Sequence, residues 1–199
     1  LEGGLYDEKI NKKFLTRAAN NVERLHFIVE DLEAISRLET GEMKLDVQTF
    51  GTRKLTEEVI EDLEMTAEEM NIELSFKEGA DQNFEVRADR EKIRRVLMNL
   101  VVNSIKYGKI DGHTKIGFYD MDSYILIEVA DNGIGIEKEH LKRVFERFFR
   151  ADKSRSRKQG GSGLGLSIVK HITEAHKQTI NLRSTYGVGS TFGFTLEKE

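Results

Sequence analysis

Two glycine-rich motifs with a basic segment between them place the strongest constraint on how this chain folds. The first is Asp131-Asn132-Gly133-Ile134-Gly135, directly after the apolar run 125–130, and the second is Gly160-Gly161-Ser162-Gly163-Leu164-Gly165-Leu166, at the start of an apolar-periodic segment. Glycine permits positive φ and close backbone approach, and the free N–H groups of a helix N-terminus bind phosphate oxygens. Together the motifs predict a nucleotide site with a mobile cover.

The segment between the motifs is strongly basic, although the chain as a whole is not. Residues 142–158 contain eight lysines and arginines but only Glu146 and Asp152 as acids, whereas the whole chain of 199 residues has a formal charge of −4. The net negative charge argues against general nucleic-acid binding. A local excess of cations between two glycine turns favours a compact anion as the ligand.

The composition is that of one packed domain with an accessory element. Hydrophobic residues make up 38% of the chain and charged residues 33%, and the absence of cysteine excludes disulfides and thiolate metal sites. No apolar run approaches the ~20 residues needed to cross a bilayer, and no signal-peptide pattern is present. We therefore expect a cytoplasmic location, with no membrane contact by this chain itself.

Residues 1–41 predict one long amphipathic helix. From about Asp7 to Thr40, apolar residues recur with the heptad-type spacing of a helix–helix seam, and Gly41 supplies a stop. The seam positions are Phe14, Ala18, Val22, Leu25, Val29 and Leu32. A helix with one narrow apolar stripe cannot bury that stripe alone, so we expect a partner helix and an oligomer.

Residues 42–199 predict a second domain in which strands and helices are mixed. Periodicity predicts strands near 43–47, 72–77, 84–88, 114–120, 124–130, 179–185 and 190–197, and helices near 52–71, 89–107, 138–149 and 164–177. Asp89 is placed to cap the helix that follows it, with Glu91 in the first turn. Because strict βαβ alternation is lacking, we expect an α+β sandwich in which three helices cover one face of a mixed or antiparallel sheet.

The predicted helix after Asp89 carries a polar stripe. At 100° per residue, Asn99, Asn103 and Lys106 fall within about 60° of one another at the edge of the apolar face, and Tyr107 follows. An amide oxygen can ligate a hard cation, and a lysine can meet phosphate as a point charge. The stripe can hold Mg²⁺ and a triphosphate. The alternative is that the asparagines only hydrogen-bond their neighbours.

Five motifs in order now resemble those of bacterial sensor histidine kinases. They are the N box (residues 99–107), the G1 box (131–135), the F box (145–150), the G2 box (161–166) and a closing glycine motif (187–192). The resemblance covers essentially all of residues 43–199. The long N-terminal helix is similar to the second helix of the family's dimerisation and histidine-phosphotransfer hairpin.

The resemblance implies the Bergerat ATP-binding fold, with ATP and Mg²⁺ as cofactors. Asn103 would ligate Mg²⁺ with Asn99 nearby, while Lys106 would contact phosphate and Tyr107 the ribose or base. Asp131 would accept a hydrogen bond from the adenine amine. A carboxylate can accept from adenine but would face an acceptor oxygen in guanine, which favours ATP over GTP.

The resemblance also implies which residues form the two ends of the site. Gly133, Gly135 and Ile136 would shape the adenine end, and Thr191 would touch the base side through water. At the phosphate end, backbone amides would come from the second glycine motif, whose members in the site are Gly161, Gly163, Leu164, Gly165 and Leu166.

The F box and the residues after it would form the cover of the site. Arg150 would reach the phosphates, and the segment 147–162 would be the ATP lid. For Phe145, Phe148 and Phe149 we expect packing in the core as the main role.

One motif of the family is missing. The phosphoacceptor of these kinases is a histidine followed by an acidic residue and soon by a proline, but this chain has no proline and none of its five histidines precedes an acid. We therefore expect a fragment of a longer sensor, one that is anchored in the bacterial inner membrane, forms a homodimer through its helical hairpin and has a response-regulator receiver domain as its partner. Each histidine present is expected to be structural or solvent-exposed.

Two other functions are compatible with the same motifs. ATP-hydrolysing members of the superfamily place a water-activating glutamate four residues before the metal-binding asparagine, where this chain has Asn99, so we expect weak or no hydrolysis. The other function is that of a non-catalytic module in which the nucleotide only sets conformation or dimerisation.

Overall fold

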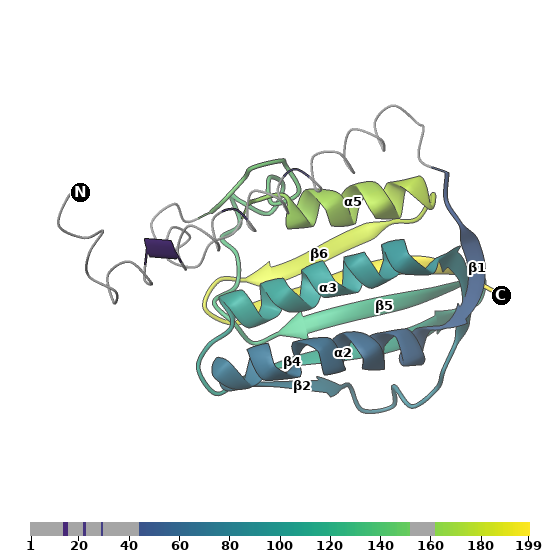
Figure 1. Cartoon of the computed structure of the whole chain (residues 1–199), viewed down its shortest axis with the longest axis horizontal. Coiled ribbons are helices and arrows are strands. Elements are labelled where there is room, and N and C mark those ends of the chain that lie inside the picture. The colour runs from purple at the N-terminus through teal and green to yellow at the C-terminus, as the bar shows by residue number, and fades with distance from the viewer. Residues whose placement is uncertain (1–13, 16–21, 23–28, 30–43, 152–161) are drawn as a thin grey trace.

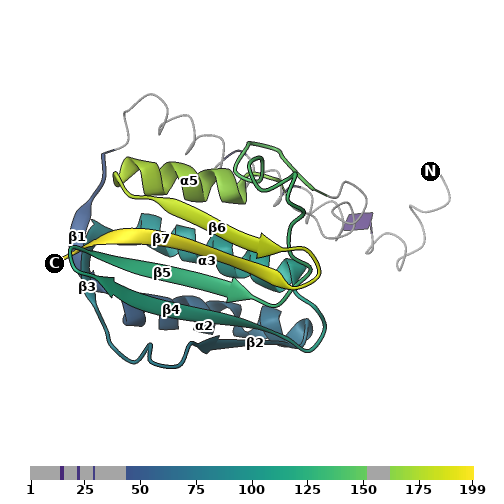
Figure 2. The same cartoon turned by 180° about the vertical axis from the view of Figure 1, so that it is seen from behind.

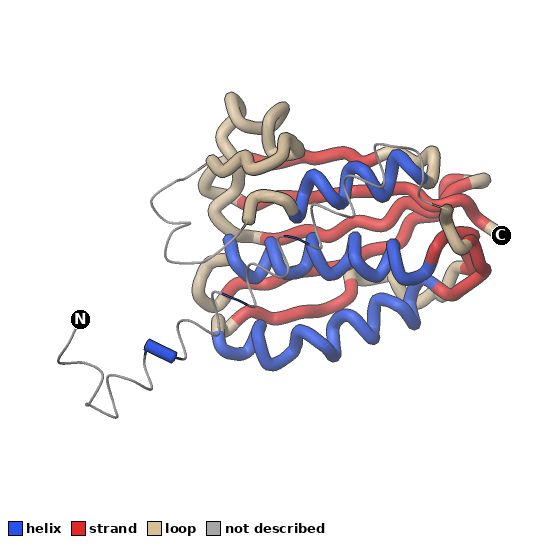
Figure 3. Tube along the Cα trace, turned by 45° about the horizontal axis from the view of Figure 1, so that its top comes forward, coloured by secondary structure: helices blue, strands red, loops and turns tan. Residues whose placement is uncertain are grey.

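The domain is a seven-stranded sheet with three helices packed on one face (Figure 1). The structure, a computed structural model, describes residues 14–15, 22, 29, 44–151 and 162–199. The view from behind shows the strands on the side opposite the helices (Figure 2), and the tilted view shows the helices lying along them (Figure 3). The expected arrangement of three helices on one face of a sheet is confirmed.

The strands form a mixed sheet. They are β1 (Val47–Gly51), β2 (Ile72–Phe76), β3 (Glu85–Asp89), β4 (Gly112–Met121), β5 (Tyr124–Asp131), β6 (Ile180–Thr185) and β7 (Gly189–Lys198). Their order is β1-β3-β7-β5-β4-β2, with β6 also paired to β7. The pair β2–β4 is parallel and the other pairs are antiparallel, so the sheet is mixed rather than purely antiparallel.

Each helix buries the apolar face that its sequence predicts. The helices are α2 (Thr52–Glu69), α3 (Arg90–Tyr107) and α5 (Gly165–Ala175). On α2 the buried face includes Leu55, Val59, Leu63 and Ala67, and on α3 it includes Ile93, Val96, Leu97, Leu100 and Val101. These side chains pack against the sheet in one continuous core, and burying each large one stabilises the fold by about 1.5–3 kcal/mol.

The prediction of a helix near 138–149 is wrong, because this segment is a series of turns. The amide of His140 bonds to the carbonyl of Glu137, that of Arg143 to His140 and that of Glu146 to Arg143, all three residues apart. Phe148 has a φ of 60°, a conformation that cannot continue a right-handed helix. The apolar side chains of the segment therefore pack in different directions and do not form one helical face.

The N-terminal predictions have different outcomes. The first strand begins at Val47 rather than near residue 43, and its buried residue is Phe50. The predicted helix 7–40 lies largely outside the described residues, so the division into domains 1–41 and 42–199 stays a prediction. Of its seam, Phe14, Val22 and Val29 are described, and all three are helical and exposed.

Asp89 joins three parts of the fold at the start of α3. Its Oδ1 accepts from the amide of Lys92 at 3.1 Å, as the predicted N-cap, and its Oδ2 accepts from the amide of Asp46 at 3.2 Å. Its own amide donates to Nε2 of His176 at 3.0 Å, just after α5. The cap therefore fixes the beginning of α3 relative to both α5 and the segment that precedes β1.

We predict that Asp89→Ala lowers the free energy of unfolding by about 1–2 kcal/mol, because a buried cap loses its acceptor. Asp89→Asn keeps an acceptor oxygen and should recover most of the loss. Urea denaturation followed by circular dichroism measures both. Asp81→Ala is the matched control, since the Asp81 side chain is 98% exposed; an equal loss in the control would contradict the capping role.

Candidate functional site

A pocket opens between the end of α3, the segment after β5 and the start of α5. Asn103, Ser104 and Tyr107 of α3 form one wall. The other walls come from Asp131 to Ile136, from the turns around Phe149, from Leu166 and from the beginning of β7. The pocket therefore brings together residues from all five motifs that the sequence analysis singled out.

Asp131 lies at the end of β5, and only one of its two carboxylate oxygens accepts hydrogen bonds from described residues. Its Oδ1 accepts from the amides of Gly133 at 2.8 Å and Ser190 at 3.3 Å. Within the described part of the chain Oδ2 accepts no hydrogen bond. Desolvation by burial raises the pKa of Asp131 above its ordinary value, and the two backbone hydrogen bonds only partly oppose this. The pocket thus presents one carboxylate oxygen that a donor on a ligand can satisfy.

The loop after β5 is pressed against the end of α3. The amide of Ile134 donates to the carbonyl of Tyr107 at 3.0 Å. A Cβ at position 133 would lie 2.4 Å from that same carbonyl oxygen, which no side chain can tolerate. Gly133 does not line the pocket itself, but its lack of a side chain lets the loop hold Asp131 beside Tyr107. The Tyr107 ring is partly exposed, and Nζ of Lys106 lies 5.4 Å from its centroid.

The two asparagines of the N box occupy different positions. Asn103 lines the pocket, and its side-chain amide makes no hydrogen bond to any described residue. Asn99, one turn earlier on α3, does not line the pocket, and its Nδ2 donates to the carbonyl of Arg95 at 2.9 Å. Its Oδ1 would be 2.7 Å from a Cβ at position 165, so any side chain there would have to displace the Asn99 amide. The free amide oxygen of Asn103 suits a hard cation such as Mg²⁺.

The second glycine motif meets the F box at the other end of the pocket. Gly163 has a φ of 76° and its carbonyl accepts from the amide of Phe148 at 3.0 Å. Leu164 is fully buried under this contact. Leu166 and Arg150 line the pocket, whereas Gly163, Leu164 and Gly165 do not. Gly161 lies outside the described residues, as does most of the predicted lid.

The three phenylalanines of the F box have three different environments. Phe145 packs on the core with its ring 6.4 Å from that of Phe192 at 88°. Phe149 lines the pocket, and its ring meets His140 edge-on at 5.5 Å. Phe148 is 56% exposed, so the expectation of core packing is wrong for it: its positive φ turns the side chain outward.

On β7 the pocket takes Ser190 rather than the predicted Thr191. Ser190 and Phe192 both line it, and because strand side chains alternate, Thr191 between them points to the opposite face of the sheet. Sequence reasoning also missed other lining residues, which are Ser104, Ile134, Val144, Phe149, Ala151, Ser190 and Phe192. The alternation of Phe192, Phe194 and Leu196 was the available signal, since it places Ser190 on the buried face.

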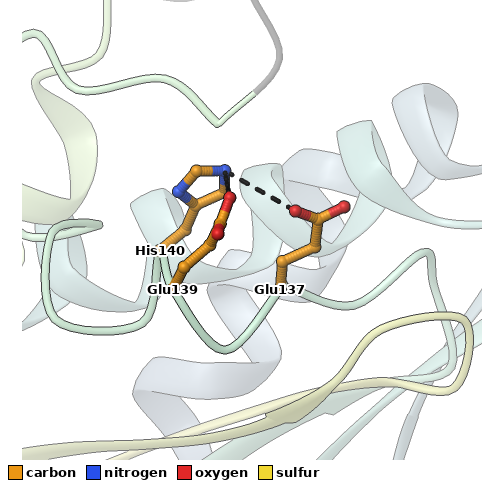
Figure 4. A group of neighbouring side chains, drawn as sticks. All are labelled: Glu137, Glu139 and His140. Carbon is orange, nitrogen blue, oxygen red and sulfur yellow. Dashed lines mark ion pairs between the residues drawn. The ribbon is translucent and has the colours of Figure 1, made fainter.

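One group in the described part of the chain could be considered for a metal outside the pocket (Figure 4). Nε2 of His140 lies 3.8 Å from Oε2 of Glu137 and 3.7 Å from Oε1 of Glu139. Both glutamates are exposed. These contacts place a histidine beside two carboxylates at the protein surface, and we assign no cation to them.

Residues 88–199 match the family described as histidine kinase-, DNA gyrase B- and HSP90-like ATPase. The chain belongs to this family. The ATP-binding catalytic domain of this family is therefore present, and every residue that lines the pocket lies within the matched range. No helix in the described part of the chain combines the length and apolar character needed to cross a membrane.

Relatives within the family are sensor kinases. The chain is 34% identical over 197 residues to the sensor histidine kinase WalK of Bacillus subtilis, covering 98% of this chain and 32% of WalK. It is 37% identical over 190 residues to the sensor-like histidine kinase SenX3 of Mycobacterium bovis, covering 96% of this chain and 46% of SenX3. The chain thus spans less than half the length of these relatives.

Solved structures agree with the fold. The catalytic domain of the histidine kinase ThkA superposes with a TM-score of 0.68 at 31% identity, covering 77% of this chain and 97% of that domain. ThkA in complex with the response regulator TrrA gives a TM-score of 0.77 at 28% identity, covering 100% of this chain and 54% of the ThkA chain.

We predict that Asp131→Asn gains stability relative to the wild type as the pH rises. Because burial raises the pKa of Asp131, the folded state holds its proton in a pH range where the unfolded chain has lost it. The wild type therefore loses stability as pH rises through this range and stays lower above the folded pKa. The variant has no such group. Urea denaturation of both proteins from pH 3 to 8 measures the difference; a variant that falls behind as pH rises would contradict it.

Proposed function

We propose that this chain is the ATP-binding kinase part of a sensor histidine kinase, which transfers the γ-phosphoryl group of Mg·ATP to a histidine on a helix outside this chain. From that histidine the group would pass to an aspartate of a response-regulator receiver domain. Support comes from the relatives WalK and SenX3 and from the complex of ThkA with a response regulator. Dimerisation through the hairpin and membrane anchoring belong to the parent protein in this proposal.

The observation that carries the proposal is the position of Asp131. It is a partly buried carboxylate at the end of the pocket lined by Asp131 and Ser190, which we call the closed end. Backbone amides donate hydrogen bonds to its Oδ1. An exocyclic amine of a purine would donate to Oδ2, whereas the carbonyl of guanine would meet a second acceptor. Apolar residues such as Ile134, Ile136 and Phe192 line the pocket beside it and fit the faces of a flat base.

At the other end of the pocket the chain offers groups for the phosphates. Arg150 lines the pocket near the start of α5, whose free amides follow Gly163 and Leu164. Asn103 would hold Mg²⁺ through its amide oxygen, with Asn99 behind it. When bound, Mg²⁺ would neutralise phosphate charge during transfer.

The domain would otherwise contribute by positioning ATP for attack by the acceptor histidine. An external imidazole nitrogen would form a bond to the γ-phosphorus as the bond to the bridging oxygen breaks, leaving ADP. The domain needs no base of its own for this step, because the neutral imidazole nitrogen attacks with its own lone pair.

The pocket gives a reason to prefer transfer over hydrolysis. Among its described lining residues Asp131 alone is a carboxylate, and it lies at the base end. The position from which a glutamate would activate water is Asn99, whose amide hydrogen-bonds the helix backbone. An ATPase would need a general base near the γ-phosphate. The described residues that line the pocket supply none at that end, which supports the kinase proposal over the ATPase alternative.

We predict that the chain binds Mg·ATP and that Asp131→Asn weakens this binding roughly ten- to a hundred-fold. The variant loses a charge-assisted hydrogen bond worth about 1.5–3 kcal/mol. Mg·GTP should bind poorly to the wild type. Isothermal titration calorimetry with both nucleotides measures these affinities, and Asp120→Asn, a surface carboxylate outside the pocket, is the matched control. Binding that is indifferent to Asp131 would refute the assigned site.

We predict phosphoryl transfer to a supplied acceptor. With radiolabelled γ-phosphate, the chain should label a histidine-bearing hairpin fragment of WalK but not the same fragment with its acceptor histidine replaced by glutamine. Asn103→Ala should abolish the labelling, while Asn181→Ala, an exposed amide on β6, should leave it unchanged. ATP binding without transfer would favour the non-catalytic module, and steady release of phosphate would favour the ATPase.

A further inference from the structure

A serine outside the pocket organises its closed end. Ser184 of β6 pairs with Ser190 of β7 in the sheet register. Its Oγ lies 2.8 Å from the amide of Ile136, 2.9 Å from the carbonyl of Gly189 and 3.0 Å from Oγ of Ser190. One hydroxyl thus contacts the loop after β5, the start of β7 and a residue that lines the pocket. Ser184 itself does not line the pocket.

The three contacts determine where the protons lie. The carbonyl of Gly189 can only accept, so it takes the single proton of Ser184. The amide of Ile136 can only donate, so it occupies one lone pair of Ser184. The contact between the two serines must then use the Ser190 proton, donated to the remaining lone pair of Ser184. The Ser190 hydroxyl therefore has only lone pairs left to offer the pocket.

The consequence concerns the polarity of the closed end. Oδ2 of Asp131 is an acceptor, and the Ser190 amide donates to Oδ1 of the same carboxylate. With the Ser190 hydroxyl also an acceptor, two neighbouring residues that line the pocket offer a bound base lone pairs only. An exocyclic amine has two N–H groups and can satisfy both, directly or through a water. A carbonyl at the same ring position would meet lone pairs from both.

The backbone around Ser184 leaves little freedom for another arrangement. A Cβ at Gly135 would lie 2.1 Å from the carbonyl oxygen of Thr185, and the amide of Gly187 donates to the carbonyl of Ile134 at 2.7 Å. The loop after β5 is therefore held closely against residues 185–187, directly after the serine. These contacts hold the three partners of Ser184 at fixed positions.

We propose that Ser184 is a positioning residue that fixes the Ser190 hydroxyl as a hydrogen-bond acceptor and thereby selects purine nucleotides with an exocyclic amine at the position facing Asp131. The inference rests on the proposed nucleotide function. It adds to that function a residue that sets base selectivity without touching the ligand.

The test compares three nucleotides that differ only at the base. ATP carries an amine at C6, ITP carries a carbonyl, and purine riboside triphosphate carries only hydrogen. In Ser184→Ala the Ser190 proton is released and can turn toward the pocket. We expect the ratio of the ITP and ATP dissociation constants to fall about three- to ten-fold, the equivalent of one hydrogen bond. Affinity for purine riboside triphosphate should change little, since it has no polar group at C6.

Three further variants separate positioning from general weakening. Ser184→Thr keeps the hydroxyl and should restore the wild-type ratio. Thr185→Ala, at the neighbouring exposed position of β6, should leave the ratio unchanged. Ser190→Ala should lower the ratio as Ser184→Ala does, and the double variant should lower it no further, because Ser184 acts through Ser190.

Each outcome of the calorimetric titrations has one meaning. Equal weakening of all three nucleotides in Ser184→Ala, or additive effects of the two serine variants, would overturn the inference while leaving the proposed function intact. A wild type that binds none of the three would overturn both. Should Ser184→Ala fail to fold, an unchanged ratio in Ser190→Ala would be decisive against the inference.

Discussion

The pairing of β5 with β7 decides which side chains reach the pocket. Its register runs from Tyr124 opposite Glu197 to Asp131 opposite Ser190. On β5 the residues Ile125, Ile127 and Val129 share a face with Asp131, and all three are at most 1% exposed. A slip of one residue would turn this whole set to solvent, at about 5–9 kcal/mol for three buried aliphatic side chains. That is comparable to the stability of a whole domain, so core burial also fixes the acceptor end of the site.

Close backbone approach is the second constraint, and it connects the site to the helices. Gly133 lies against the last carbonyl of α3, and Gly165 lies against the side chain of Asn99. A methyl group at position 133 would push the loop away from α3, and one at position 165 would displace the Asn99 side chain. The glycines thus act mainly through packing: they let α3, the loop after β5 and α5 converge on one volume. A hydrogen bond from Asp89 to His176 joins the start of α3 to the end of α5, so the two helices that flank the pocket are tied at the ends away from it.

Most of the fold could be predicted from the sequence because its long elements have clear periodicity. The helices α2 and α3, the cap at Asp89 and the later strands follow from apolar spacing alone. The prediction of a helix at 138–149 is wrong although the apolar residues of this segment repeat at helical intervals. Val144 and Phe149 line the pocket, Phe145 packs against Phe192, and Phe148 has a positive φ that ends any helix. For the site, motifs identified Asn103, Tyr107 and Asp131, which all line the pocket. They could not reveal Ser184, whose importance lies in hydrogen bonds between segments about 50 residues apart.

The acceptors at the closed end are costly to the folded protein. Burial raises the pKa of Asp131, which means that the charged form is less stable there than in water, and one of its oxygens has no partner among the described residues. A fold selected for stability alone would place an amide or an apolar side chain at this position. The neighbouring Ser184 hydroxyl uses its proton and both lone pairs in its three contacts, so the free acceptor capacity beside Asp131 lies with Ser190. Unpaired acceptors in an otherwise satisfied wall give the site its selectivity, because only a ligand that supplies donors removes the cost.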